Sequence, residues 1–92
     1  MRECDIEAYL RDQVRALGGK AYKFVSPGNA GVPDRLVCFP GGRAVFAELK
    51  APGGKLTALQ QARCRELARL GHTVIVLDSK SAVDDFVEGL SQ

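Results

Sequence analysis

The short turn Pro40-Gly41-Gly42 constrains the fold more than any other feature, because it separates two strand-like segments. These segments, residues 34–39 and 43–49, carry the valines and phenylalanines typical of strands. A connection this short joins antiparallel neighbours. A loop centred on its middle residue places residues whose numbers sum to 82 opposite each other. The sequence therefore predicts a hairpin in which Asp34 faces Glu48, whereas a slip of one residue would send their side chains to opposite faces.

The remaining patterns place helices and strands on both sides of this hairpin. Apolar residues spaced by three or four positions predict helices, and short apolar runs bounded by Gly or Pro predict strands. The α-β-β-β-α-β-α order predicts an α/β fold with a mixed central sheet flanked by helices. The expected elements are a helix with the stripe Ile6, Leu10, Val14 and Leu17 that stops at Gly18-Gly19, a strand from Lys20 to Val25, a loop from Ser26 to Pro33, strands from Asp34 to Phe39 and from Arg43 to Leu49, a helix from about Ala58 to Leu70, a strand from Thr73 to Leu77 and a helix from Ser81 to Leu90.

Length and charge narrow the possibilities further. A chain of 92 residues is expected to form one domain, residues 1–92. A domain this small favours a homodimer, because its own core buries little surface. Residues 78–92 carry a net charge of −3 and the other 77 residues carry +5. This split has two readings: an ordinary solvated surface, or a basic body that binds a polyanion while an acidic segment faces away from it.

Cysteines and apolar runs indicate the compartment. Cys4, Cys38 and Cys64 are odd in number and lack C-x-x-C spacing, which argues against a disulfide framework and against a zinc site. The sequence has no run of 18 apolar residues and no signal-peptide pattern at its N-terminus. We therefore expect a cytoplasmic protein without membrane contact.

The predicted pairing of Asp34 with Glu48 is the strongest chemical signal. Directly opposed side chains on one sheet face have Cβ atoms about 4.5–5.5 Å apart, so two carboxylates there repel each other unless a divalent cation lies between them. Lys50 shares the face of Glu48, where an ammonium can orient or deprotonate water and stabilise developing charge. Hard oxygen ligands favour Mg²⁺ or Mn²⁺. The alternative is an exposed salt bridge between Lys50 and one carboxylate.

These residues belong to a longer run of motifs. Gly31-Val32-Pro33-Asp34, Glu48-Leu49-Lys50 and Thr57-x-x-Gln60 together resemble the VRR-NUC domain of the PD-(D/E)XK nuclease superfamily, over nearly the whole chain. The resemblance implies a restriction-endonuclease-like core and metal-dependent hydrolysis of phosphodiester bonds. It also implies that Asp34, Glu48 and the backbone carbonyl of Leu49 hold the metal, and that Lys50 is the catalytic lysine.

The resemblance also suggests a substrate. The family includes the nuclease domain of the Fanconi-associated nuclease, and short stand-alone members of bacteria and their viruses that are similar to junction resolvases acting as dimers on branched DNA. We therefore expect a Mg²⁺- or Mn²⁺-dependent endonuclease for structured DNA, such as four-way (Holliday) junctions, in the cytoplasm of a bacterium or of an infected host. Two alternatives stay open: a DNA-binding module of the same fold that does not cleave, and an interaction subunit that cuts only within a larger assembly.

Three further residues are candidates beside this centre. The resemblance implies a glutamate on the first helix close to the metal. Glu7 borders the apolar stripe, about 65° from its centre at about 100° per residue, and is predicted to act on the metal through water. Glu3 is one turn earlier, and a simple helix-dipole role is the alternative for a glutamate here. Gln60 completes a capping box with Thr57, and the resemblance suggests that it also supports the active site or a phosphate; the two roles are compatible.

DNA contacts are predicted around the same centre. In the loop before Asp34, glycines would let backbone N–H groups approach a phosphate. Ordinary solvated loop residues and surface charges are the alternative reading. Gly54-Lys55-Leu56 imitates the end of a P-loop but lacks its Ser or Thr, so no nucleotide cofactor is expected. The predicted contacts are Ser26, Gly28 and Asn29 in the loop, and Lys23, Lys55 and Arg63 as phosphate-binding cations.

Overall fold

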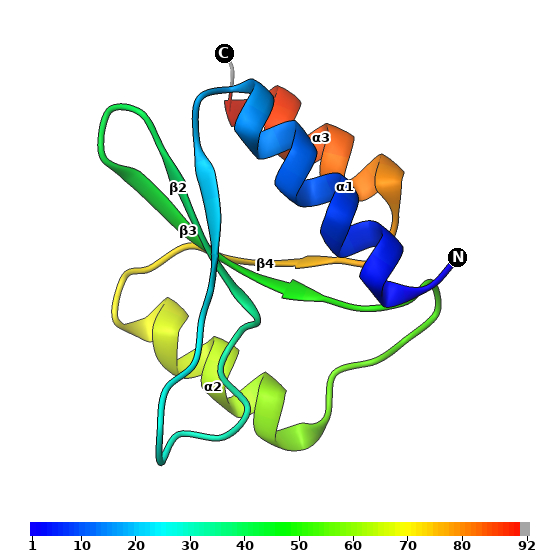
Figure 1. Ribbon diagram of the computed structural model, residues 1–92. Coiled ribbons are helices and arrows are strands. Elements are labelled where there is room, and N and C mark those ends of the chain that lie inside the picture. The colour runs from blue at the N-terminus through cyan, green and yellow to red at the C-terminus, as the bar shows by residue number, and fades with distance from the viewer. Residues whose placement is uncertain (91–92) are drawn as a thin grey trace.

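The computed structural model describes residues 1–90 and has the predicted order of elements (Figure 1). The α/β class and the α-β-β-β-α-β-α order are therefore confirmed. None of the helices within residues 1–90 is both long and apolar enough to span a membrane. The elements are α1 (Glu3–Ala16), β1 (Lys20–Lys23), β2 (Arg35–Phe39), β3 (Arg43–Leu49), α2 (Ala58–Arg69), β4 (Val74–Leu77) and α3 (Lys80–Leu90).

The end of α2 and the starts of β4 and α3 each differ by one residue from the sequence-based expectation. Three further differences affect the edge of the sheet, the site and the core. β1 ends at Lys23 rather than Val25, because the chain leaves the edge of β2 once Phe24 N–H has donated to the Asp34 carbonyl at 2.9 Å. Asp34 lies directly before β2 rather than within it. Leu17 follows the last turn of α1 as its C-cap and is exposed. The apolar stripe of α1 therefore has three buried members instead of four.

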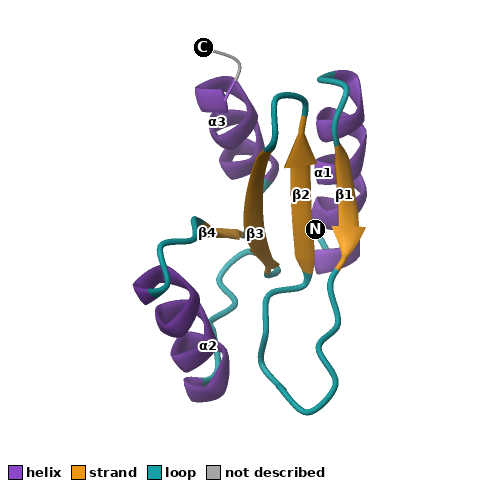
Figure 2. Cartoon of the chain, turned by 90° about the vertical axis from the view of Figure 1, so that its left-hand side faces the viewer, coloured by secondary structure: helices purple, strands orange, loops and turns teal. Residues whose placement is uncertain are grey.

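The four strands form one sheet in the order β1-β2-β3-β4 (Figure 2). β1, β2 and β3 are antiparallel, whereas β3 and β4 are parallel, so the sheet is mixed as predicted. The register of β2 and β3 pairs Leu36 with Phe46 and Arg35 with Ala47. These pairs confirm the predicted hairpin register. One step further along it, Asp34 lies opposite Glu48.

Helices cover the two faces of the sheet unequally. α1 and α3 lie side by side on one face, and α2 lies on the other (Figure 1). Ile6, Leu10 and Val14 of α1 are fully buried in the core, where Val83 of α3 joins them. All of α2 is described by the structure, and none of its residues is buried. The main core therefore lies on the α1–α3 face, and the α2 face is only partly covered.

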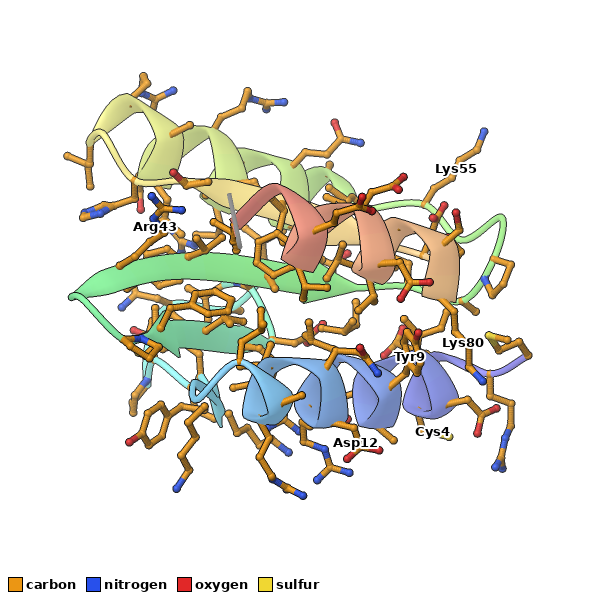
Figure 3. The ribbon with its side chains drawn as sticks, turned by 90° about the horizontal axis from the view of Figure 1, so that it is seen from above. Cys4, Tyr9, Asp12, Arg43, Lys55 and Lys80 are labelled. Carbon is orange, nitrogen blue, oxygen red and sulfur yellow. The ribbon has the colours of Figure 1, made fainter. Side chains whose placement is uncertain are left out.

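Polar contacts add to the packing of α1 against α3. The Tyr9 hydroxyl donates to Asp84 Oδ1 at 2.5 Å, and Lys80 Nζ lies 5.3 Å from the centre of the Tyr9 ring (Figure 3). Ser79 Oγ accepts from Ala82 N–H at 3.0 Å at the start of α3. The acidic C-terminal segment noted in the sequence is therefore anchored to the outer side of α1 through Asp84.

In the turn after α1, the backbone of Gly19 lies very close to the backbone of β2. A substitution at Gly19 can therefore test this packing. A Cβ atom on Gly19 would lie 2.5 Å from the Cys38 carbonyl oxygen and 3.0 Å from Val14 Cγ1. We therefore predict that Gly19→Ala lowers the free energy of unfolding by about 1–3 kcal/mol, since backbone atoms cannot move aside as a side chain can. Urea unfolding measures the change.

Gly89→Ala is the matched control for this prediction. Gly89 lies in α3 with nothing in the described chain within 4 Å of an added Cβ. Its replacement should leave stability unchanged or raise it by up to about 1 kcal/mol. Equal stability of the two variants would contradict the close contact between the end of α1 and β2.

Candidate active site

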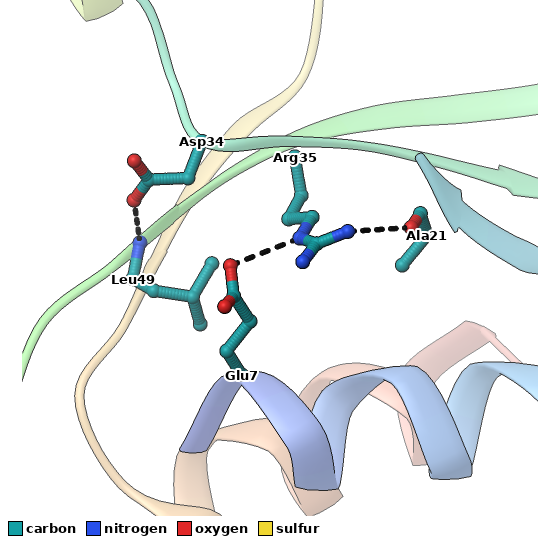
Figure 4. Close-up of polar contacts among 5 residues, drawn as sticks. All are labelled: Glu7, Ala21, Asp34, Arg35 and Leu49. Atoms are coloured by element: carbon teal, nitrogen blue, oxygen red, sulfur yellow. Dashed lines mark hydrogen bonds and ion pairs between the residues drawn. The ribbon is translucent and has the colours of Figure 1, made fainter. Parts of the chain in front are cut away.

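Asp34, directly before β2, lies beside Glu48, near the end of β3. The Asp34 Oδ2 atom accepts a hydrogen bond of 2.9 Å from the Leu49 N–H (Figure 4). This bond fixes the Asp34 carboxylate beside β3, next to the neighbouring residue Glu48. Asp34 is also in hydrogen-bond contact with the Glu48 side chain. The structure thus brings together two carboxylates from adjacent segments of the sheet.

Glu48 is a buried acid, with 1% of its surface exposed. Its Oε2 atom has no hydrogen-bond partner among residues 1–90. Burial raises the pKa of Glu48 to about 8; the hydrogen bond and negative charge of Asp34 add to this rise, and the charge of Lys50 opposes it. Near neutral pH, Glu48 therefore holds a proton beside Asp34 unless a cation takes the place of that proton.

Lys50 continues the line of β3. Its N–H donates to the Leu77 carbonyl at 3.0 Å, so the pairing with β4 extends one residue past the end of β3. Residues two apart in extended chain share a face of the sheet. The charge of Lys50 acts on Glu48, and its side chain is half-buried. Asp34, Glu48 and Lys50 therefore form one group, which we call the acidic centre.

The donors of the acidic centre suit a divalent cation. Glu48 offers an unpartnered buried carboxylate oxygen, Asp34 a second carboxylate, and Leu49 a backbone carbonyl. All are hard oxygen donors of the kind that Mg²⁺ and Mn²⁺ prefer. Within residues 1–90, no group of three or more His, Cys, Asp or Glu side chains is arranged to hold one ion.

Comparison with known proteins identifies the family. No family model matches the chain. A protein of Acyrthosiphon pisum secondary endosymbiont phage 1, named "Putative nuclease p44", is 56% identical over 80 residues, which cover 87% of this chain and 86% of that protein. A solved structure described as a VRR_NUC domain matches with a TM-score of 0.88 and 31% identity, over 94% of each chain. The chain belongs to the VRR-NUC family.

Membership of the VRR-NUC family confirms the resemblance drawn from the sequence motifs. The close match over almost the whole length also confirms the fold class, because the mixed four-stranded sheet with helices on both faces is shared with the VRR_NUC structure. The roles of individual residues in this member depend on its own geometry.

Glu7 is held by an ion pair rather than by the acidic centre. Its Oε2 atom accepts from Arg35 Nε at 3.0 Å, and Arg35 Nη1 donates to the Ala21 carbonyl at 3.1 Å (Figure 4). The Glu7 and Arg35 side chains are 32% and 12% exposed, so water screens the pair incompletely. These contacts tie α1 to β1 and β2 directly beside Asp34. A water-linked role of Glu7 at a metal stays a prediction.

Glu3 has an electrostatic effect on the acidic centre. Its negative charge contributes to the raised pKa of Glu48, after the larger effects of burial and Asp34. The sequence left the choice between Glu3 and Glu7 open. Arg35 neutralises Glu7, whereas Glu3 acts on Glu48 itself. The choice between Glu3 and Glu7 as the acid of α1 beside a metal therefore stays a prediction.

Gln60 completes a capping box at the start of α2. Its backbone N–H donates to Thr57 Oγ1 at 3.1 Å, and its side-chain Oε1 accepts from the Thr57 N–H at 2.9 Å. This satisfies two backbone donors at the helix end. The Gln60 amide nitrogen has no acceptor within residues 1–90. Only the amide nitrogen of the Gln60 side chain is therefore free to support the active site.

The predicted DNA-contacting residues surround the loop that leads to Asp34. Ser26 Oγ accepts from Asn29 Nδ2 at 2.9 Å, so these two side chains fold the loop onto itself. Arg63 Nε donates to the Ala30 carbonyl at 2.9 Å and ties α2 to the same loop. The remaining three are exposed, and Figure 3 shows Lys55 extending outward: Lys23, Gly28 and Lys55.

Cys64 is a neighbour of the acidic centre that the sequence analysis missed. Burial raises the pKa of the Cys64 thiol, and the negative charge of Glu48 raises it further. Cys64 follows Gln60 by four residues and therefore lies on the same side of α2. This spacing was the one sequence signal for its position, and it becomes meaningful only once α2 is placed over Glu48.

The buried acid predicts a pH-dependent stability. The pKa of Glu48 rises from its ordinary value of 4.5 to about 8 on folding, so the folded state favours the protonated acid. Without metal, the free energy of unfolding should therefore fall as pH rises between these values, by up to about 1.4 kcal/mol per pH unit. Urea unfolding in EDTA at about pH 6 and about pH 8 measures this slope.

Glu48→Gln is the control, since an amide does not titrate and should remove most of the slope. Mn²⁺ should reduce the loss of stability at high pH in the unsubstituted protein, because a metal binds the deprotonated carboxylate. A slope unaffected by Glu48→Gln would contradict the burial of an ionisable group at this position.

Proposed function

We propose that this VRR-NUC protein is a Mg²⁺- or Mn²⁺-dependent endonuclease of structured DNA, with residues 1–92 as one nuclease domain. The observation that carries the proposal is the buried, unpartnered Glu48 carboxylate beside Asp34 and Lys50. Such a group is unfavourable in a folded protein unless it has a charged partner. The name of the phage relative, a nuclease, supports the same activity.

The residues of the acidic centre divide the catalytic work. Asp34, Glu48 and the Leu49 carbonyl would hold the cation. When bound, this ion supplies positive charge to phosphate oxygens and lowers the pKa of water. Lys50 donates its ammonium hydrogens to the phosphate and stabilises the charge that develops on the oxygens. Its position beside two carboxylates also orients an attacking water.

Three polar residues would complete the site around this group. The free amide nitrogen of Gln60 donates to a phosphate oxygen or to water. A glutamate of α1 would hold a water beside the cation. Glu3 is one candidate, through its charge effect on Glu48, and Glu7 is the other, through Oε1, because its Oε2 accepts from Arg35. These roles rest on the placement of the side chains around Glu48.

DNA binding is proposed to rely on phosphates more than on bases. The loop before Asp34 and the start of α2 offer polar groups and cations for these contacts. Branched DNA, such as a four-way junction, is the substrate class that the family resemblance favours. The three cysteines are free, which fits the reducing cytoplasm in which we place the protein. The contacts proposed are Lys23, Ser26, Gly28, Asn29, Lys55 and Arg63.

Cleavage assays test the proposed activity. We predict that Asp34→Asn and Lys50→Ala each slow cleavage of a labelled four-way junction in Mg²⁺ by at least about 100-fold, while DNA binding changes little. Asn at position 34 keeps an acceptor for the Leu49 N–H and so preserves the fold. Duplex, flap and single-stranded substrates in the same assay identify the preferred DNA structure.

Lys80→Ala is the matched lysine control, because Lys80 lies on α3 beside Tyr9. This variant should cleave DNA at the rate of the unsubstituted protein. If the Asp34 and Lys50 variants cut at the unsubstituted rate, the assignment of the acidic centre is wrong. Binding of junctions without cleavage by any variant, including the unsubstituted protein, would instead favour a non-cleaving module.

We also propose that the protein is a homodimer in solution. The α2 side exposes Leu59, Leu70 and Val76, with exposed fractions of 47%, 69% and 46%. Three large apolar side chains on one thinly covered side are typical of a protein contact surface. Sedimentation analysis is predicted to give twice the chain mass, and Leu70→Lys is predicted to weaken the dimer.

Val25→Lys is the control for this variant. Val25 is exposed to nearly the same extent, 68%, but follows β1 at the opposite edge of the sheet from β4. Its replacement should leave the mass unchanged. A single-chain mass at tens of micromolar protein would overturn the dimer proposal and leave the nuclease proposal intact.

A further inference from the structure

A groove between α1 and β1 gathers positive charge away from the acidic centre. α1 and β1 lie side by side at one edge of the molecule (Figure 2). Basic residues of three elements line the groove, and no acidic side chain of the described chain is among its lining residues. The cations are Arg11 and Arg15 of α1, Lys20 and Lys23 of β1, and Arg35 of β2.

Most of these charges are available to a ligand. Arg35 forms the floor and is neutralised by Glu7. Arg15 is 4.0 Å from Asp12, with both side chains at least 70% exposed, so that contact is weak. Arg11, Lys20 and Lys23 have no ion-pair partner within residues 1–90. Four exposed cations therefore line this one groove.

The protection of a free sheet edge explains only part of this pattern. β1 is an edge strand, and lysines on such strands discourage pairing with other chains. That requirement accounts for Lys20 and Lys23. It does not account for Arg11 and Arg15, which lie four residues apart on α1 and face the same groove. Cations from a helix and a strand that face one channel suit an extended polyanion.

One end of the groove lies next in the sheet to the backbone segment that carries Asp34. Lys23 pairs with Arg35 in the sheet, and the next backbone contact joins Phe24 to Asp34. From Lys20 to Lys23 the strand covers about 10 Å, at about 3.3 Å per residue. Phosphates of one DNA strand advance by about 3.4 Å along a duplex axis. A duplex whose axis runs along β1 would therefore bring about three successive phosphates of one strand past this length.

We propose that the α1–β1 groove binds the phosphate backbone of a DNA strand that continues from the cleavage position at Asp34. The proposal rests on the proposed nuclease function for its choice of DNA as the polyanion. It adds Arg11, Arg15 and Lys20 to the contacts around the acidic centre. The exposed Tyr22, whose ring lies 4.8 Å from Lys20 Nζ, borders the groove and gives an unpaired base a surface for stacking.

Salt-dependent binding tests the groove. The double variant Arg11→Gln, Arg15→Gln is compared with Arg65→Gln, Arg69→Gln, an exposed pair with the same spacing and charge change on α2. Binding of fluorescent duplex and single-stranded DNA is measured in Ca²⁺ or EDTA over a range of salt. Thermal unfolding confirms that both double variants are folded.

The α1 variant should bind about tenfold more weakly than the α2 variant at moderate salt, and its salt slope should fall by about 1.8 on duplex or about 1.4 on single strands. If the α1 variant loses more affinity for single strands than for duplex, and Tyr22→Ala also weakens single-strand binding more than duplex binding, the single strand is the occupant of the groove. Affinity and slope equal to those of the α2 variant would overturn the proposal.

The two proposals fail differently. If the unsubstituted protein binds DNA through Arg11 and Arg15 but never cleaves it, the groove stands and the nuclease proposal fails. If it cleaves DNA and the α1 variant binds as the α2 variant does, the nuclease proposal stands and the groove fails.

Discussion

The close approach of two carboxylates inside the sheet is the constraint on which the site depends. Glu48 is buried at 1% exposure with one oxygen unpartnered among residues 1–90, and Asp34 is held beside it by the Leu49 N–H. Neither feature stabilises the metal-free fold, since burial and like charge both oppose ionisation of Glu48. The surrounding structure must therefore hold the Asp34 and Glu48 carboxylates close together at a cost in stability, and a bound cation would offset this cost.

The unequal faces of the sheet provide that support. On one face, α1 and α3 bury a continuous core that includes Leu49, the residue between Glu48 and Lys50. Leu49 therefore packs residues 48–50 against the core on the α1–α3 face, while its neighbours Glu48 and Lys50 point to the opposite face. α2, which has no buried residue in a fully described helix, covers that face only partly. The acidic centre thus lies on the partly covered face of a strand whose other face is packed in the core.

Charge is also divided between the sides of α1. Its contact with α3 brings it beside the acidic C-terminal segment, through the bond from Tyr9 to Asp84. Its other side meets β1, where Arg11 and Arg15 face the lysines of the strand. The basic body and the acidic segment visible in the sequence therefore correspond to opposite sides of one helix. The DNA strand proposed above would be attracted to the β1 side and repelled from the α3 side.

The sequence by itself determined the order of elements, the family and the meeting of Asp34 with Glu48, because a short turn fixes the hairpin register and the two-residue period of a strand fixes which side chains share a face. Only the tertiary structure decided that Arg35 holds Glu7, that Glu3 acts on Glu48, that Cys64 lies near the acidic centre and that two arginines of α1 meet the edge of β1. These contacts depend on how a helix is rotated and shifted against the sheet. That placement results from the packing of the whole core, for which local spacing carries no signal.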